Sequence, residues 1–191
     1  MKVILTIAAA VALGVALGIA SAWQGVESAK PFDTIRIGVW EARPSAGTEE
    51  ADPYSRAWLA RTGELPLGSG EGLELIAVRD RDGATLTGGC AYRLIGRTPP
   101  ARLWTVAVER ADGAPLAGRP ERHALGSDSI LRAPDGTFTL HLASEPRPGN
   151  WLSSRHAGPI RLVIRLYDTT ARTVTGVTTF AMPDIVAEGC A

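Results

Sequence analysis

Hydrophobic and small residues fill the start of the chain without interruption. From Val3 to Ala22 every position is apolar, small or weakly polar, and the flanking charges are Lys2 and Glu27. Twenty residues at helical rise span about 30 Å, the thickness of the hydrocarbon core of a bilayer. The pattern therefore predicts a helix that either anchors the chain in a membrane or is removed as a signal peptide. Both outcomes place the rest of the chain outside the cytoplasm.

Features of this run support each outcome. The A-x-A-like sequence Ala20-Ser21-Ala22 favours cleavage after Ala22, whereas the apolar run is longer than the roughly 7–15 residues of a cleaved signal. Gly14 and Gly18 form a G-x-x-x-G stripe, which predicts a helix-packing face and a homodimer through it, or simply the small residues of an export signal. We expect retention as a single-pass inner-membrane anchor. The charge of Lys2 before the span predicts a cytoplasmic N-terminus and a periplasmic C-terminal domain, which would be soluble in the periplasm after cleavage.

One further helix is predicted after this run. Asp52 is typical of an N-cap and Pro53 of a first helical position, and Gly63 is a stop signal. The residues at helical spacing between them are Tyr54, Ala57, Trp58 and Arg61. We therefore predict one short helix in the exported part of the chain.

After Gly72 the hydrophobic pattern changes to a period of two, which is typical of strands. The predicted strands are Leu73–Arg79, Cys90–Ile95, Leu103–Glu109, Thr137–Ala143, Ile160–Tyr167 and Thr173–Phe180, with an earlier one at Thr34–Trp40. Asp112-Gly113 and Asp135-Gly136 predict tight turns. Strands separated by turns indicate an antiparallel β-sandwich or jelly roll. We predict a leader over 1–22, a linker over 23–33 and one domain over 34–191.

Composition narrows the partners of this domain. The chain has 20 basic and 20 acidic side chains and no basic block, so we expect no binding to nucleic acid. Its three histidines are too scattered in sequence to indicate a metal site, and no motif indicates a cofactor. Cys90 and Cys190 are the two cysteines. An isolated pair predicts a disulfide in an oxidising compartment.

Several short motifs occur in a characteristic order. They are D-P-Y-S-R-A-W-L-A-R at Asp52–Arg61, G-x-C-A-Y-R-L at Gly88–Leu94, P-P-A-R-L-W-T at Pro99–Thr105, D-G at Asp135-Gly136, P-G-N-W-L at Pro148–Leu152 and R-L-Y-D at Arg165–Asp168. This order resembles the DUF1214 family over roughly Ile35 to Cys190. The resemblance implies a short membrane-anchored protein with a jelly-roll-like sandwich, and no established activity. Larger relatives carry a DUF1254-type domain first, which we expect this chain to lack.

The strand predicted at Ile160–Tyr167 carries the candidate binding residues. Its even positions are apolar and are expected to face the core. Arg161, Arg165 and Tyr167 lie on the other face, suited to a carboxylate, a phosphate or a sugar hydroxyl, with Trp151 as a stacking platform. The other interpretation is an outer face on which both arginines pair with acidic residues of a neighbouring strand.

No nucleophile–base pair is evident, so we predict no catalytic residue. We expect a cell-envelope protein whose β-sandwich is a binding or structural module with an unknown ligand. The alternative is an envelope enzyme that acts on glycans or lipids, with Glu109, Asp128 or Glu145 in acid/base roles. That alternative requires two carboxylates in one cleft, about 5–9.5 Å apart.

Overall fold

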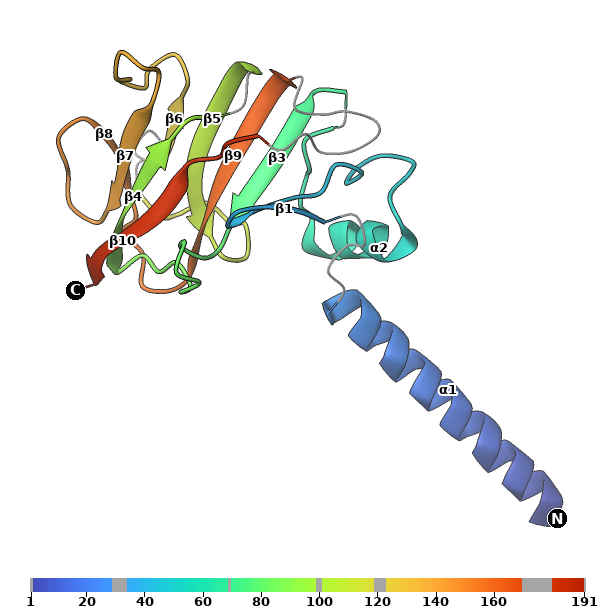
Figure 1. Cartoon of the computed structure of the whole chain (residues 1–191). Helices are drawn as coiled ribbons and strands as arrows, with labels where there is room; N and C mark the ends of the chain where they lie inside the picture. Colours follow the sequence, from blue (N-terminus) through green and yellow to red (C-terminus); the bar gives the residue numbers. More distant parts are fainter. Residues whose placement is uncertain are drawn as a thin grey trace.

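The computed structural model describes residues 2–28, 34–68, 70–98, 101–118, 123–169 and 180–190. Its first element, the helix α1 (Lys2–Ser28), projects away from the sheets (Figure 1). An 18-residue window within Lys2–Glu27 has a mean hydropathy of 2.6, and no residue of that window is buried. By length and composition this helix can cross a membrane, and a signal sequence has the same properties. The helix continues to Ser28, into the segment predicted as a linker.

The second helix, α2 (Pro53–Thr62), begins and ends where its capping residues predict. The Asp52 carboxylate accepts hydrogen bonds from the backbone N–H groups of Tyr54, at 2.9 Å, and Ser55, at 3.1 Å. Gly63 adopts a left-handed conformation with φ of 69°, and its N–H donates to the carbonyl of Leu59. The local sequence therefore determines where this helix begins and ends.

Within the described ranges, ten strands form two sheets (Figure 1). The six-stranded sheet has the order β1-β2-β3-β9-β5-β6, and the four-stranded sheet has the order β10-β4-β7-β8. The first sheet comprises β1 (Ile35–Ile37), β2 (Trp40–Ala42), β3 (Gly72–Ala77), β9 (Ile160–Thr169), β5 (Ala101–Arg110) and β6 (Ala124–Gly126). The second comprises β10 (Asp184–Cys190), β4 (Cys90–Gly96), β7 (Phe138–Ala143) and β8 (Asn150–Ser153). The described pairs are antiparallel except β7 with β8, which is parallel.

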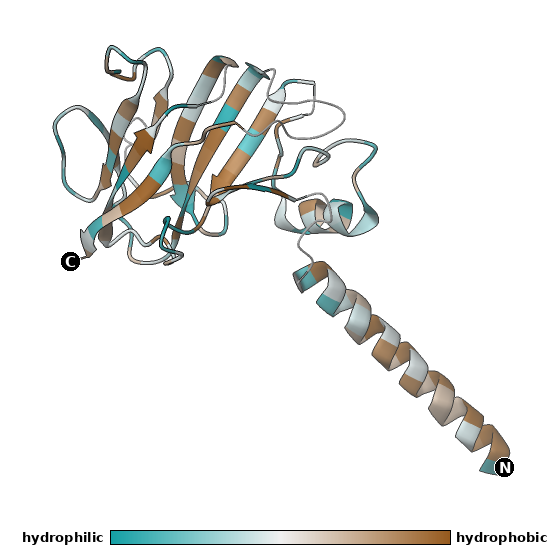
Figure 2. Cartoon of the chain, viewed as in Figure 1, coloured by the Kyte–Doolittle hydropathy of each residue, from teal (hydrophilic) through white to brown (hydrophobic). Residues whose placement is uncertain are grey.

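Both sheets contribute to one hydrophobic core. Alternate positions of β9, such as Leu162 and Ile164, are fully buried, and they join Leu94 and Leu140 of the other sheet in one cluster. Figure 2 shows the corresponding alternation of hydrophobic and hydrophilic residues along the strands. The chain is thus mainly β, as predicted, and its two layers fit a β-sandwich. The jelly-roll connectivity stays a prediction.

Several element boundaries differ from the predictions. The predicted strand Thr34–Trp40 is a hairpin, β1 and β2, because Gly38 turns the chain with φ of 60°. The sequence predicts no strand at β6, β8 or β10, because β6 and β8 have only three and four residues and the seven residues of β10 do not alternate. The predicted strand Thr173–Phe180 lies outside the described residues apart from Phe180, which is not in a strand.

The C-terminal strand β10 is joined to β4 at its end. Cys190 is the register partner of Cys90, and the two sulfur atoms lie at disulfide distance, 1.95 Å apart. The predicted pairing is therefore the one that the fold brings together. It closes a loop with a sequence separation of 100 residues.

Candidate functional site

The outer face of β9 carries the charged residues that the sequence singled out. Arg161 lies in register opposite Glu109 of β5, and Arg165 lies in register opposite Glu74 of β3. Both neighbours of β9 thus place a carboxylate beside its arginines. The arrangement matches the second interpretation of this face, in which the arginines pair with a neighbouring strand.

These side chains form a continuous network with a third carboxylate. Arg161 donates from Nη1 to Glu64 at 2.6 Å and from Nε to Oε2 of Glu109 at 2.9 Å. Arg165 donates from Nη2 to Oε1 of Glu109 at 3.1 Å and from Nε to Glu74 at 2.7 Å. Glu109 therefore bridges the two arginines, one carboxylate oxygen to each.

The network is largely shielded from solvent. The Arg161 side chain is 9% exposed and that of Glu109 is 15% exposed. Burial by itself lowers the pKa of Arg161, but the hydrogen bonds and charges of Glu64 and Glu109 outweigh it, so the net pKa is raised. The pKa of Arg165 is raised for the same reasons, with Glu74 and Glu109 as partners. Both guanidinium groups therefore stay charged at all physiological pH values.

Glu64 comes from the segment that follows α2. Gly63 ends that helix in a left-handed turn, and this turn directs the next residue over β9. On the other side of Arg161 lies the turn Asp112-Gly113, where Gly113 has φ of 85°. A β-carbon on Gly113 would lie 2.6 Å from Nη2 of Arg161 and 2.8 Å from Oε1 of Glu64. Glycine thus suits both the turn and the close approach of the ion pair, and a β-carbon would displace the ends of the Arg161 and Glu64 side chains.

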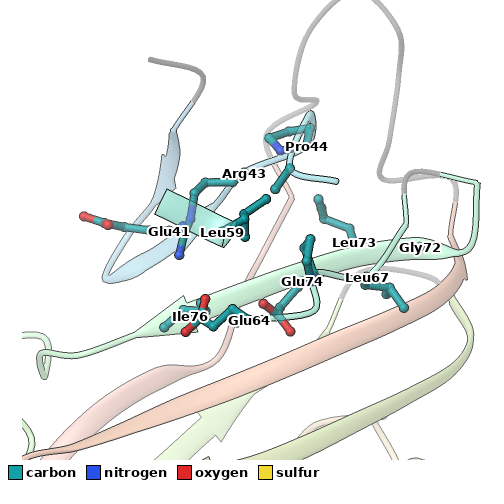
Figure 3. Close-up of a pocket in the computed structure, with 12 residues that line it drawn as sticks. Glu41, Arg43, Pro44, Leu59, Glu64, Leu67, Gly72, Leu73, Glu74 and Ile76 are labelled. Carbon is teal, nitrogen blue, oxygen red and sulfur yellow. The ribbon is translucent and has the colours of Figure 1, made fainter. Parts of the chain in front are cut away.

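Two cavities adjoin the network. One lies between α2 and β3 and is narrow, about 20 Å³, enough for one water molecule (Figure 3). Figure 3 shows Glu64 and Glu74 along its β3 side, with Leu59 and Arg43 across from them. The second cavity is open, with a volume of about 330 Å³. Its charged lining consists of Glu64, Glu74, Glu109, Asp112, Arg161 and Arg165.

The structure brings only part of the predicted binding set together. Arg161, Arg165 and Tyr167 lie on one face of β9, as the alternation predicts. Trp151 lies on β8 of the other sheet, next to the inward-facing Leu152, and its Nε1 donates to the carbonyl of Ala143. A site on the outer face of β9 therefore does not include Trp151. The binding roles themselves stay predictions.

The carboxylates considered for the enzyme alternative occupy different places. Glu109 lies in the network and lines the larger cavity, whereas Asp128 and Glu145 do not line that cavity. Glu145 pairs with Arg155 at 2.6 Å on the surface, where both side chains are exposed. Glu64 and Glu74 do share the cavity with Glu109, and each of these three carboxylates is ion-paired to an arginine.

The residues that sequence reasoning missed at this site are Glu64 and Glu74. Glu74 has a detectable signal, because it is the polar position of the alternating strand Leu73–Arg79. Glu64 has none, since it lies 97 residues before its partner Arg161. Only the three-dimensional path of the chain after α2 brings it there.

The carboxyl end of α1 contacts α2. Arg61 pairs with Glu27 at 3.0 Å, and its guanidinium lies 4.6 Å from the centre of the Trp23 ring. The Tyr54 ring packs against Gly25, where a β-carbon would lie 3.2 Å from the ring. The predicted helix-packing residues Gly14 and Gly18 lie farther along α1 and have open space around their α-carbons. Dimerisation through them stays a prediction.

Comparison with known proteins identifies related sequences and folds. A family model described as "Protein of unknown function (DUF1214)" matches residues 71–171. The crystal structure of the VPA0106 protein from Vibrio parahaemolyticus is similar, with a TM-score of 0.61 and 18% sequence identity over 92% of this chain and 44% of that one. An uncharacterised protein from Burkholderia cenocepacia has a TM-score of 0.43 and 21% identity, over 64% of this chain and 31% of that one. The chain thus spans less than half the length of either protein. No curated protein matches it.

Proposed function

This chain belongs to the DUF1214 family, and we propose that it is a membrane-anchored protein of the cell envelope whose β-sandwich is a ligand-binding module. The family match covers most of the two sheets, and the family description assigns no activity. The proposal therefore rests on the two features outside the hydrophobic core, which are the exposed apolar helix α1 and the charged cavity on β9.

The helix α1 is the feature that supports membrane anchoring. The side chains of its apolar window are not buried against any part of the described chain. A bilayer supplies an apolar environment for them. Lys2 before the span and Glu27 after it favour an orientation with the sandwich on the periplasmic side. Cys90 and Cys190 at disulfide distance support an oxidising compartment.

The ligand-binding part is carried by the cavity beside the ion network. Its volume of about 330 Å³ lies in the range of small-molecule sites. Its charged lining contains four carboxylates and two guanidinium groups, and both guanidinium groups are already ion-paired. An anionic ligand is therefore disfavoured. The expected ligand is a neutral polyhydroxylated molecule or a cation, which can bond to carboxylate oxygens at the rim.

The anchoring is tested by fractionation in a bacterial host with a periplasm. The matched control is the double variant Ala20→Leu and Ala22→Leu, which removes the A-x-A-like sequence. We expect both proteins to stay in the membrane pellet after alkaline carbonate washing and to be degraded by protease added to spheroplasts. A soluble periplasmic wild-type protein beside a membrane-bound variant would overturn the anchoring.

Ligand binding is tested separately, by native mass spectrometry of the membrane-extracted full chain. Ala114 lines the cavity and takes no part in the ion network, so the larger side chain of Ala114→Leu obstructs part of the cavity while the ion pairs remain. Ala133→Leu is the matched control, because Ala133 is exposed before β7 in the other sheet. We expect a co-purifying small molecule on the wild type and on Ala133→Leu, and its loss from Ala114→Leu. Equal retention by all three proteins would place the ligand elsewhere.

A further inference from the structure

We propose that α2 lies in the headgroup layer of the membrane and holds the sandwich against the bilayer surface. The proposal rests on the anchoring proposed above, and its occupant is the phospholipid surface itself. It is argued from the position of α2 along α1 and from the side chains that both helices present there. Figure 1 shows α2 beside the carboxyl end of α1, between that helix and the sheets.

The depth of α2 follows from its contact with α1. If Val3–Ala22 crosses the hydrocarbon, Gly25 lies three residues beyond it, about 4.5 Å along the helix axis. The headgroup layer on each side of a bilayer is about 5–7 Å thick. Tyr54, at the first turn of α2, packs directly on Gly25. The start of α2 is therefore within the headgroup layer.

The side chains at this level have the chemistry of a membrane interface. Trp23 is 60% exposed and follows the apolar run directly, and Tyr54 is 44% exposed. Amphipathic aromatic rings are enriched at the headgroup level, where the ring is partly in hydrocarbon and the polar atom is hydrated. Arg61, in the last turn of α2, pairs with Glu27 and stacks on the Trp23 ring. These contacts place the second half of α2 at the same depth as Trp23.

The helix α2 is only partly packed against the rest of the chain, through the contact of Trp58 with Arg43 and through Leu59 beside β3. Within Pro53–Thr62 only Ser55 is buried, although the segment contains Tyr54, Trp58 and Leu59. The ten helical residues include Arg56 and Arg61 and no acidic residue. Aromatic and cationic side chains are typical of segments at the membrane interface. The contact with α1 makes this docking continuous with the membrane span.

Docking is tested by nitroxide labels on the full chain in nanodiscs of phosphatidylethanolamine and phosphatidylglycerol. Three exposed alanines are replaced singly by cysteine, leaving the native Cys90–Cys190 pair in place. Ala60 reports on α2, Ala133 on the loop before β7 and Ala10 on the middle of the span. The measurement is the accessibility of each label to dissolved oxygen relative to a water-soluble nickel chelate, which rises with depth in the bilayer.

We expect a high ratio at Ala10, an intermediate ratio at Ala60 several times that at Ala133, and a low ratio at Ala133. A ratio at Ala60 equal to that at Ala133, with Ala10 still deep, would refute the docking and leave the anchoring intact. A water-exposed label at Ala10 would refute both. As a second readout, Trp23→Ser combined with Tyr54→Ser is expected to lower the ratio at Ala60 and leave that at Ala10 unchanged. An unchanged Ala60 ratio in this variant would show that the aromatic side chains do not hold α2 in the interface.

Discussion

Glu64, which follows α2, forms an ion pair with Arg161 of β9 and so links the helical part of the molecule to the sandwich. The Glu64 carboxylate lies 2.6 Å from Nη1 of Arg161, although 97 residues separate them. Three residues before Glu64, Arg61 pairs with Glu27 of α1. The segment around α2 is thus ion-paired to α1 on one side and to β9 on the other. If α1 is retained in the membrane as proposed, these contacts link the sandwich to it.

Replacing Arg161 with leucine is expected to destabilise the fold. The change leaves Glu64 and Glu109 beside β9 without their main partner, and breaking a buried pair in this way costs about 3 kcal/mol. Arg102→Leu is the matched control, because its pair with Asp168 is exposed, at 78% and 76%, and contributes less than about 1 kcal/mol. Urea denaturation of the detergent-solubilised full chain measures both. Equal midpoints for the two variants would show that the network contributes no more than a surface pair.

Two glycines with the same backbone conformation allow the free-energy cost of turn strain to be measured apart from the cost of the close approach to Arg161. Gly113 and Gly136 both follow an aspartate and have φ of 85° and 83°. A β-carbon on Gly136 meets nothing within 4 Å, whereas one on Gly113 meets Arg161 and Glu64. Gly136→Ala is expected to cost about 1 kcal/mol for the left-handed conformation. Gly113→Ala is expected to cost roughly 1–3 kcal/mol more because it displaces the ion pair, and equal losses in denaturation would contradict this.

The Cys90–Cys190 pair is expected to stabilise the sandwich mainly through the unfolded chain. A cross-link that closes a loop of about 100 residues contributes roughly 4.7 kcal/mol in the chain-entropy model. Replacing both cysteines with serine should therefore lower the urea midpoint strongly, and reducing agent should act on the wild type alone. If the wild type has the same midpoint with and without reductant, the pair is not a stabilising disulfide.

The N-cap residue Asp52 makes the stability of α2 depend on pH. Its pKa is lowered by the side-chain hydrogen bond from Ser55 first and then by the backbone N–H groups of Ser55 and Tyr54. The folded-state pKa lies below the ordinary value of 3.8. The ionised carboxylate therefore stabilises the folded state fully above about pH 3.8. This stabilisation is lost as the pH falls through the lowered pKa.

The matched variant for this titration is Asp52→Asn, which keeps a capping oxygen but cannot titrate. We expect the difference in stability between wild type and Asp52→Asn to shrink below pH 3.8. A difference that is constant from pH 6 to pH 2.5 would show that the Asp52 carboxylate does not contribute through its charge. Hydrogen exchange of the α2 amides measures the effect where it occurs.

The elements predicted from sequence are those that local chemistry determines. Asp52 and Gly63 delimit α2, and the alternation in Ile160–Tyr167 correctly separates the core face of β9 from its charged face. The sequence allows two interpretations of the charged face, because the register that places Glu109 and Glu74 beside β9 depends on strands far apart in sequence. The same limit applies to Trp151, whose short strand β8 pairs in parallel with β7 on the other sheet.

The membrane anchor remains the most consequential claim, since both the position of the sandwich and the docking of α2 depend on it. It is tested most directly by the intact mass of the native protein purified from unfractionated cells. We predict a chain that retains Val3–Ala22, with a mass close to the full 20.1 kDa. A protein that begins at Trp23 would contradict it.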